Sequence, residues 1–202
     1  MKLYYAPGAC SLSPHIVLNE IGIPYDAVKV DLKTKTFNGG QSFTQIAGKG
    51  YVPMLELDDG RRLTEGPAIL QYLADQHPEK KLAPPNGSFE RYQLQEWLNF
   101  ITSEIHKAFT PLFNPAASPD WRQAVTDKLS NRFDWLSKQL SGKPYLMGEQ
   151  FTVADAYLFT MLSWAKHVKF ELAPWPALQD YQARVGTRPA VQQTLKSEGL
   201  LR

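Results

Sequence analysis

The secondary-structure pattern of this sequence changes once, at a stretch near residue 80 that contains prolines and a glycine. Before it, short β-favouring segments and helical segments replace one another every few residues. After it, apolar side chains recur almost throughout at the three- and four-residue steps of amphipathic helices. The stretch itself holds Pro78, Pro84, Pro85 and Gly87 among charged residues, which is typical of a linker. The sequence therefore predicts a mixed α+β domain over 1–80, a linker over 81–87 and an all-helical domain over 88–202.

The first domain is expected to run β-α-β, then an irregular stretch, then β-β-α. Ser11 is a candidate N-cap for the first helix, and Gly22 suits its C-terminal end. Asp58-Asp59-Gly60 is a turn signal between two strands. We expect strands over 1–5, 25–32, 54–57 and 61–63, and helices over 11–21 and 65–76.

The second domain is expected to hold five helices, over 88–113, 120–140, 152–170, 176–185 and 189–197. Thr152 with Asp155 three residues later forms a capping-box pattern, in which each side chain satisfies a backbone N–H of the other residue. This pattern indicates a structural device that starts a buried helix, and it does not indicate a catalytic acid.

Charge and cysteine content narrow the classes of function. The net charge of +2 is too small to imply nucleic acid or an anionic membrane as a partner, and no apolar run is long enough to span a membrane. The single cysteine, Cys10, cannot form an intrachain disulfide and offers no metal-binding cluster. With no signal-peptide pattern at the N-terminus, a reducing compartment, the cytoplasm, is expected.

Cys10 follows a predicted strand and a Pro-Gly turn and directly precedes a predicted helix. The helix N-terminus carries a partial positive charge, which favours the thiolate and indicates a reactive cysteine. A buried, inert cysteine that packs as a small hydrophobe fits the same position. Position alone leaves both interpretations open.

Three further features each have a ligand-binding interpretation and an ordinary structural one. Val52-Pro53 stands directly before a strand; a cis bond there would leave backbone groups of Val52 to pair with a peptide-like ligand, and a plain trans proline fits as well. Glu65-Gly66 opens a helix whose N-terminus suits an anion, although a simple helix cap explains it too. Lys35 is most simply a loop lysine.

A polar stripe is predicted on the first helix of the second domain. Asn99, Ser103 and His106 are four and three residues apart, so an α-helix would place them on one face. That face could line a cleft or simply meet water.

These features together resemble the glutathione transferase family, and most closely its beta class. The match occurs in family order and spans nearly the whole chain. It is carried by residues 5–13 (YAPGACSLS), 49–53 (KGYVP), 63–66 (LTEG), 96–99 (EWLN), 104–107 (EIHK) and 151–159 (FTVADAYLF). The resemblance implies a thioredoxin-like N-terminal domain followed by a helical domain, assembled as a homodimer, with glutathione as co-substrate and neither metal nor cofactor.

The resemblance also implies roles for individual residues. The γ-glutamyl end of glutathione would meet Glu65 and the N–H of Gly66, its cysteinyl backbone would pair with Val52 ahead of cis-Pro53, and its glycine carboxylate would lie near Lys35. The sulfur would lie between Cys10 and a group on the second domain: Asn99, Ser103, Glu104 and His106. Tyr5 and Ser11 are further candidate sulfur donors, although packing and helix capping explain them as well.

The expected activity is attack of the glutathione thiolate on a hydrophobic electrophile, as in detoxification, with Cys10 and His106 as the catalytic residues. Phe109, Phe113 and Trp164 are candidate walls of the electrophile pocket. Two alternatives stay open: a glutathione-dependent thiol-disulfide oxidoreductase or peroxidase that uses Cys10, and a non-catalytic binding protein on the same fold.

Overall fold

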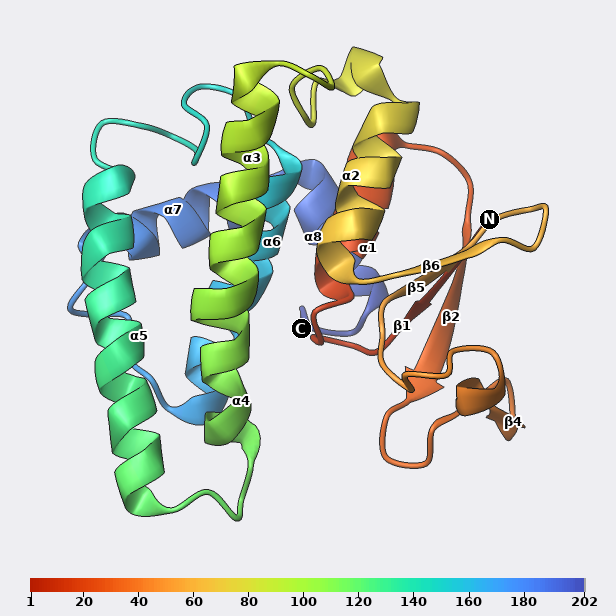
Figure 1. Cartoon of the computed structure of the whole chain (residues 1–202), viewed down its shortest axis with the longest axis horizontal. Coiled ribbons are helices and arrows are strands. Elements are labelled where there is room, and N and C mark those ends of the chain that lie inside the picture. Colours follow the sequence, from red (N-terminus) through yellow and green to blue (C-terminus); the bar gives the residue numbers. More distant parts are fainter. Residues whose placement is uncertain (202) are drawn as a thin grey trace. The chain divides into compact units, whose positions relative to one another are not determined.

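The computed structural model describes residues 1–201, and its contacts divide the chain into two compact units (Figure 1). The first unit is Met1–Lys80 together with the C-terminal segment that begins at Arg188, and the second is Lys81–Thr187. The division between Lys80 and Lys81 lies at the start of the expected linker. The C-terminal segment differs from the expected division, which placed it in the helical domain.

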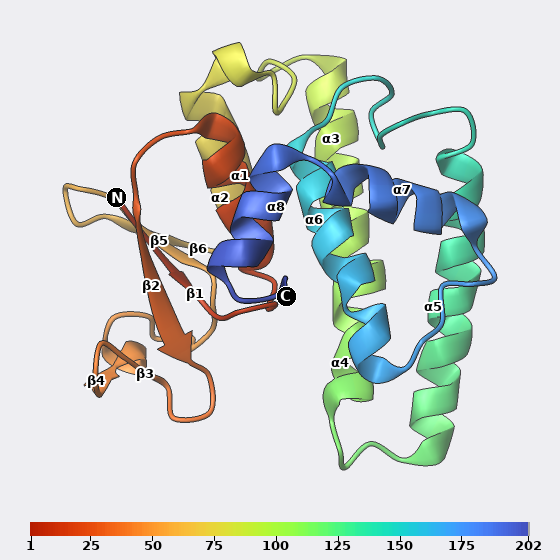
Figure 2. The same ribbon diagram turned by 180° about the vertical axis from the view of Figure 1, so that it is seen from behind.

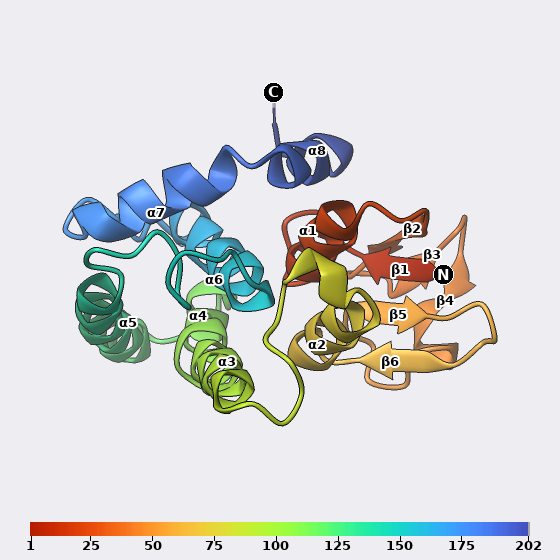
Figure 3. The same cartoon turned by 90° about the horizontal axis from the view of Figure 1, so that it is seen from above.

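The C-terminal segment joins the first unit because α8 (Pro189–Ser197) packs against α1 (Leu12–Ile21), as Figures 2 and 3 show. Three polar pairs hold this seam. Arg188 bonds Glu20 through two nitrogens at 2.6 and 3.0 Å, Asn19 donates to Thr194 at 2.7 Å, and His15 Nδ1 lies 2.6 Å from Glu198 Oε1. Glu198 and His15 are almost fully buried, so each satisfies the other where water cannot reach.

The first unit contains one six-stranded sheet with the strand order β4-β3-β2-β1-β5-β6. β1 and β2 are parallel, and the remaining neighbours are antiparallel. The strands are β1 (Lys2–Tyr5), β2 (Asp26–Asp31), β3 (Thr36–Phe37), β4 (Gln41–Ser42), β5 (Met54–Glu56) and β6 (Arg62–Thr64). β3 and β4 lie within the stretch predicted to be irregular; at two residues each, they are too short to show an alternating pattern.

Successive side chains of β1 point to opposite faces of the sheet, and each face packs against its own set of core residues. Tyr5 packs on His15 of α1, with ring centroids 5.1 Å apart. Tyr4 points the other way, onto Phe37 and Phe43 at 5.3 and 5.8 Å. α1 and α2 (Gly66–Gln76) lie side by side on one face of the sheet (Figure 1). On the second face, Phe37, Phe43 and Ala47 pack against Tyr4 and Met54.

The second unit is helical, as predicted. Its helices are α3 (Phe89–Phe100), α4 (Lys107–Phe113), α5 (Pro119–Gln139), α6 (Val153–Ser163) and α7 (Pro176–Gly186). The helix expected over 88–113 is continuous but contains a π-helical turn, Ile101–His106, between α3 and α4. The helix expected over 152–170 ends early, at Ser163, and gives way to a short 3₁₀ turn that stops at Lys169 in the left-handed conformation. Within residues 1–201, no helix is both long and apolar enough to cross a membrane.

The capping box at the start of α6 is confirmed and extends further than the sequence indicates. The carboxylate of Asp155, fully buried, accepts from the N–H of Thr152 at 2.9 Å and from its hydroxyl at 3.0 Å. It also accepts from the N–H of Leu146 at 2.9 Å and from the hydroxyl of Tyr181 at 3.0 Å. Asp155 thus joins α6, α7 and the segment before α6.

Replacing Asp155 by alanine should strongly destabilise the protein, because three buried donors would lose their acceptor and the Tyr181 hydroxyl would keep only the backbone carbonyl of residue 155, at 3.3 Å. Each unsatisfied buried donor costs about 1–3 kcal/mol, so a loss of roughly 3 kcal/mol or more in the free energy of unfolding is expected. Urea denaturation followed by circular dichroism measures it. Ser118→Ala, which removes the exposed N-cap of α5, is the control and should cost about 1 kcal/mol. Equal losses in the two variants would contradict this view of Asp155.

Candidate active site

The register of β5 gathers most of the predicted site residues of the first unit at one end of the sheet. Met54, the first residue of β5, pairs with Tyr4 near the end of β1 and with Thr64 at the end of β6. The residues just before β5 and just after β1 and β6 therefore lie at the same end of these three strands. These residues include Cys10, Val52, Pro53, Glu65 and Gly66.

Cys10 and Val52 meet directly at this end of the strands. The half-buried Cys10 thiol donates to the carbonyl of Val52 at 3.2 Å, across 42 residues of sequence. The Val52–Pro53 peptide bond is cis, as the resemblance implies. A thiol that donates to a carbonyl carries its proton, so this contact favours the protonated form, whereas the N-terminus of α1 favours the thiolate.

Ser11 and Tyr5 are committed to the structure around Cys10. Ser11 occupies the N-cap position of α1, as predicted, but its side chain makes no capping hydrogen bond. Its buried hydroxyl instead accepts from the N–H of Ala6 at 3.1 Å and donates to the carbonyl of Ala6 at 3.2 Å, which closes the loop that leads to Cys10. Tyr5 is packed against His15, and burial raises the pKa of its phenol.

Glu65 and Gly66 open α2 with an unusual backbone. Glu65 has φ 73°, in the region that favours glycine, and this strain holds its exposed carboxylate at the start of the helix. The carboxylate forms an ion pair with Lys49 Nζ at 2.5 Å. An exposed pair of this kind contributes little stability, so a ligand's ammonium group could replace Lys49 at small cost.

Lys35 lies beside the loop that leads to Val52. Its Nζ donates to the carbonyl of Gly50 at 2.9 Å and lies 5.5 Å from the ring centroid of Tyr51. Tyr51 is 70% exposed. Lys35 is thus a fixed cation next to the Val52–Pro53 segment, and it is more constrained than a simple loop lysine.

In the second unit, the predicted polar stripe is divided by the π turn. Asn99 and Ser103 are exposed and stay together, with the Ser103 hydroxyl donating to the carbonyl of Asn99 at 3.0 Å. Glu104 points to α5, where it pairs with Arg132 at 2.7 Å and Lys128 at 3.3 Å. The hydrogen bond from Arg132 lowers the pKa of Glu104, and the two ion pairs give this carboxylate a structural role.

His106 turns toward α6. Its Nδ1 lies 2.7 Å from the hydroxyl of Tyr157, and its ring packs edge-on against Trp164 at 5.0 Å. Trp164 also contacts Phe109 and Phe113, at 5.9 and 5.3 Å, so the three residues suggested as pocket walls form one aromatic cluster next to His106. Of these, Phe109 is completely buried and Phe113 is 47% exposed, so Phe109 is a core residue.

Comparison with known proteins places this geometry in a family. Models described as the glutathione S-transferase N-terminal and C-terminal domains match residues 8–76 and 119–184. Glutathione S-transferase GstA of Escherichia coli O157:H7 is 44% identical over 200 residues, which cover 99% of this chain and all of that protein. This chain belongs to the glutathione transferase family.

The solved structures refine the relationship to the bacterial beta class. BphK, a bacterial glutathione transferase solved as a ternary complex, is 58% identical with a TM-score of 0.97, and the match covers 99% of this chain and 100% of that one. The beta-class enzyme of Sphingomonas chungbukensis is 48% identical with a TM-score of 0.96 over the full length of both chains.

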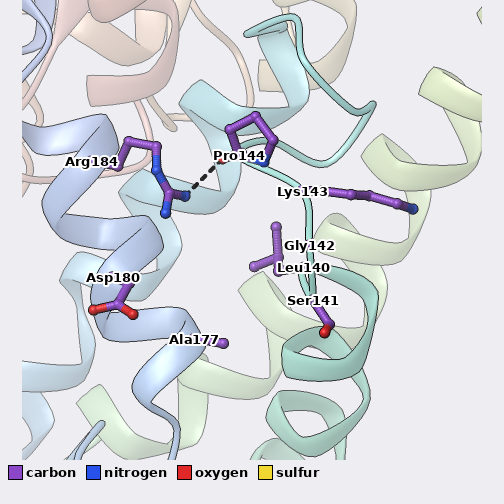
Figure 4. Close-up of a pocket in the computed structure, with 8 residues that line it drawn as sticks. All are labelled: Leu140, Ser141, Gly142, Lys143, Pro144, Ala177, Asp180 and Arg184. Carbon is purple, nitrogen blue, oxygen red and sulfur yellow. Dashed lines mark hydrogen bonds between the residues drawn. The ribbon is translucent and has the colours of Figure 1, made fainter.

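Figure 4 shows a separate pocket of about 420 Å³ in the helical unit of this transferase. It lies between the end of α5 and α7, and Arg184 at its edge donates to the carbonyl of Pro144 at 3.0 Å. Its charged side chains, Lys143, Asp180 and Arg184, are exposed and of mixed sign. It contains none of the predicted site residues and is an ordinary surface hollow.

Two partners of the candidate residues, one in each unit, were not predicted from the sequence. Lys49 stands within the quoted stretch 49–53, but a lysine next to a glycine gives no sign that it pairs with Glu65. Tyr157 stands two residues after Asp155, the last residue of the capping box, among apolar residues, where a tyrosine usually indicates core packing. Its spacing from His106 carries no signal, because the contact joins two helices.

Ser11→Ala should lower stability more than it lowers ligand binding, because the hydroxyl serves both backbone groups of Ala6. The N–H of Ala6 would lose this acceptor, whereas its carbonyl still accepts from the N–H of Ala9 at 3.1 Å, so the expected loss is about 1–3 kcal/mol of unfolding free energy. Urea denaturation measures that loss, and calorimetric titration with glutathione measures binding. Ser11→Thr keeps the hydroxyl and serves as the control. Full stability of Ser11→Ala combined with lost binding would show that Ser11 contacts the ligand instead.

Proposed function

We propose that this glutathione transferase uses its first unit to bind glutathione and conjugates the tripeptide's thiolate to small hydrophobic electrophiles. The observation that carries the proposal is the convergence of Cys10, Val52–Pro53 and Glu65–Gly66 at one end of the sheet, in a chain similar over its whole length to named transferases. Within residues 1–201, no group of three His, Cys, Asp or Glu side chains could hold a metal ion.

Each end of glutathione has a chemically matched partner in the first unit. The ammonium of the γ-glutamyl group pairs with Glu65, and its carboxylate meets the N–H of Gly66 at the N-terminus of α2. The backbone of the cysteinyl residue pairs with Val52, and the glycine carboxylate is attracted by Lys35. This direction brings the sulfur to Cys10.

The sulfur must be held as an anion. A free thiol has a pKa of about 8.5, and lowering it by two units requires about 2.7 kcal/mol of preference for the thiolate. Hydrogen bonds from His106 and from backbone N–H groups near Cys10 and Ser11, together with the dipole of α1, are of the right size. We assign Asn99, Ser103 and Glu104 to the surroundings of the ligand, with Glu104 acting through its pairs with α5.

The family resemblance supports the wider setting that we propose. The electrophile is apolar and packs against aromatic side chains such as Trp164 and Phe113, and the reaction is one of detoxification. Glutathione is a co-substrate, and no cofactor takes part. The working assembly is a homodimer in the cytoplasm, where glutathione is kept reduced.

Disulfide exchange is the second candidate function, and the Cys10 thiol beside the expected sulfur position is the observation that favours it. In that reaction the Cys10 thiolate would attack a disulfide between glutathione and a second thiol, which releases the second thiol and leaves Cys10 joined to glutathione as a mixed disulfide. A second glutathione thiolate would then attack the mixed disulfide, which releases the Cys10 thiolate and oxidised glutathione. The relatives named above are transferases, so conjugation is the better supported function, and a purely non-catalytic binding role has the least support.

Glu65→Gln should weaken glutathione binding about tenfold or more, because the amide removes the charge that pairs with the ligand's ammonium group. Isothermal titration calorimetry measures the dissociation constant. Glu90→Gln, an exposed carboxylate in the first turn of α3, is the matched control and should bind normally. Unchanged binding in Glu65→Gln would contradict the proposed orientation of the tripeptide.

Cys10→Ala separates the two candidate reactions. Conjugation of an aromatic halide should survive in part, because the nucleophile is the sulfur of glutathione, whereas reduction of a mixed glutathione disulfide should be lost. Both activities are measured spectrophotometrically on the same preparation, and Cys10→Ser serves as a near-isosteric control. Loss of conjugation to the uncatalysed rate would make Cys10 itself essential for the transferase reaction.

A further inference from the structure

The carboxylate of Glu65, which the proposed function pairs with the ammonium group of glutathione, is held by a cation of the protein itself. Lys49 Nζ lies 2.5 Å from Glu65 Oε1. The ε-ammonium of a lysine and the α-ammonium of a γ-glutamyl residue are chemically alike, so each makes the same charge-assisted hydrogen bond to a carboxylate. Two such cations on one carboxylate repel each other, so pairing with one weakens pairing with the other.

The loop that carries Lys49 is fixed by backbone contacts. The N–H of Gly50 donates to the carbonyl of Ala47 at 2.7 Å, and the carbonyl of Gly50 accepts from Lys35 Nζ at 2.9 Å. Gly50 has a φ of 65°, a conformation that favours glycine. Because the backbone around Lys49 is held in this way, its pairing with Glu65 costs mainly the rotamer freedom of two side chains.

Glu65 is fixed from the opposite direction, by the strand that precedes it. It directly follows β6, which ends at Thr64, and its own φ of 73° sets the direction of the chain into α2. Arg62 of the same strand donates to the carbonyl of Ile46 at 3.4 Å, a long hydrogen bond that joins β6 to the loop of Lys49. The backbone of one compact unit therefore brings the two charges together.

The two lysines of this region have partners of different charge. Lys35 donates to a carbonyl, which leaves its positive charge available to attract a carboxylate of the ligand. The charge of Lys49 is balanced by the carboxylate of Glu65. Lys35 thus favours binding of an anionic group, whereas Lys49 opposes binding of an ammonium group at Glu65.

We propose that Lys49 is a built-in competitor for the γ-glutamyl ammonium group and lowers the affinity of the site for every ligand that carries this group. The inference rests on the proposed function, in which Glu65 binds that ammonium. Glutathione then binds by exchanging one ion pair at Glu65 for another. A glutathione conjugate carries the same γ-glutamyl group, so the return of Lys49 to Glu65 also favours release of the product.

The expected size of the effect follows from the exposure of the pair. The side chains of Lys49 and Glu65 are 56% and 65% exposed, so solvent screens their attraction. Removing the competitor in Lys49→Gln should therefore tighten glutathione binding about two- to fivefold, the range that an exposed ion pair supplies. Isothermal titration calorimetry measures the dissociation constant.

Two variants control for charge. Lys29→Gln removes the same charge from an exposed lysine on β2, and its effect gives the contribution of long-range attraction to an anionic ligand. Binding in Lys49→Gln is compared with this variant. Lys49→Arg keeps a cation beside Glu65 and should bind glutathione within about twofold of the wild type.

Two ligand probes separate competition for the ammonium group from other effects. S-methylglutathione lacks the thiol but keeps the γ-glutamyl ammonium, so Lys49→Gln should tighten its binding by the same factor. An analogue of glutathione in which hydrogen replaces the γ-glutamyl amino group cannot displace Lys49. Lys49→Gln should not tighten binding of this analogue. In a Glu65→Gln background, Lys49→Gln should have no effect beyond that of Lys29→Gln, because the contested carboxylate is gone.

The outcomes distinguish this inference from the proposed function. Binding of glutathione in Lys49→Gln that is no tighter than in Lys29→Gln overturns the inference alone, provided that Glu65→Gln weakens binding. Equal tightening of the analogue without the amino group also overturns it, because Lys49 would then oppose some other part of the ligand. If the wild type does not bind glutathione, or if Glu65→Gln binds it normally, the proposed orientation of the tripeptide fails and the role of Lys49 fails with it.

Discussion

The pairing of β5 between β1 and β6 is the constraint on which the first unit depends. This short strand places Met54 beside Tyr4 and Thr64. The segments that follow β1, precede β5 and follow β6 therefore meet at one end of these three strands. Shifting the register by one residue would turn Met54 and its neighbours to the opposite face of the sheet. Both the thiol of Cys10 and the carboxylate of Glu65 are therefore positioned by strand register, and the local loops add only the final orientation.

The C-terminal segment shows a different way of completing a unit. α8 docks on α1 through the pairs Arg188–Glu20 and His15–Glu198, and Glu198 also accepts from the N–H of Gly8 at 2.8 Å. The last helix of the chain therefore supports the loop that precedes Cys10. Removing one partner of such a buried pair leaves the other without compensation, so the docking of α8 depends on specific polar contacts as well as on apolar packing.

The sequence predicted those features that depend on local signals. The capping box at Thr152, the left-handed Gly22 and the turn at Gly60 each depend on neighbouring residues, and the structure confirms all three. The features that the sequence did not predict depend on contacts between segments that are distant along the chain. The Ser11 hydroxyl bonds both backbone groups of Ala6 in place of the expected capping bond, because Ser11 meets the end of β1. The segment that carries α8 joins the first unit through Arg188, whose partner Glu20 lies 168 residues earlier.

The first helical stretch of the second unit illustrates why site geometry is harder to predict than helix content. Residues 88–113 have helical periodicity, yet an α-helical spacing of Asn99, Ser103 and His106 misplaces the last of the three. The π turn changes the direction of His106, and only the packing of α6 provides the Tyr157 hydroxyl that this ring meets. The direction of the His106 ring is therefore set by a contact between two helices, which no sequence period records.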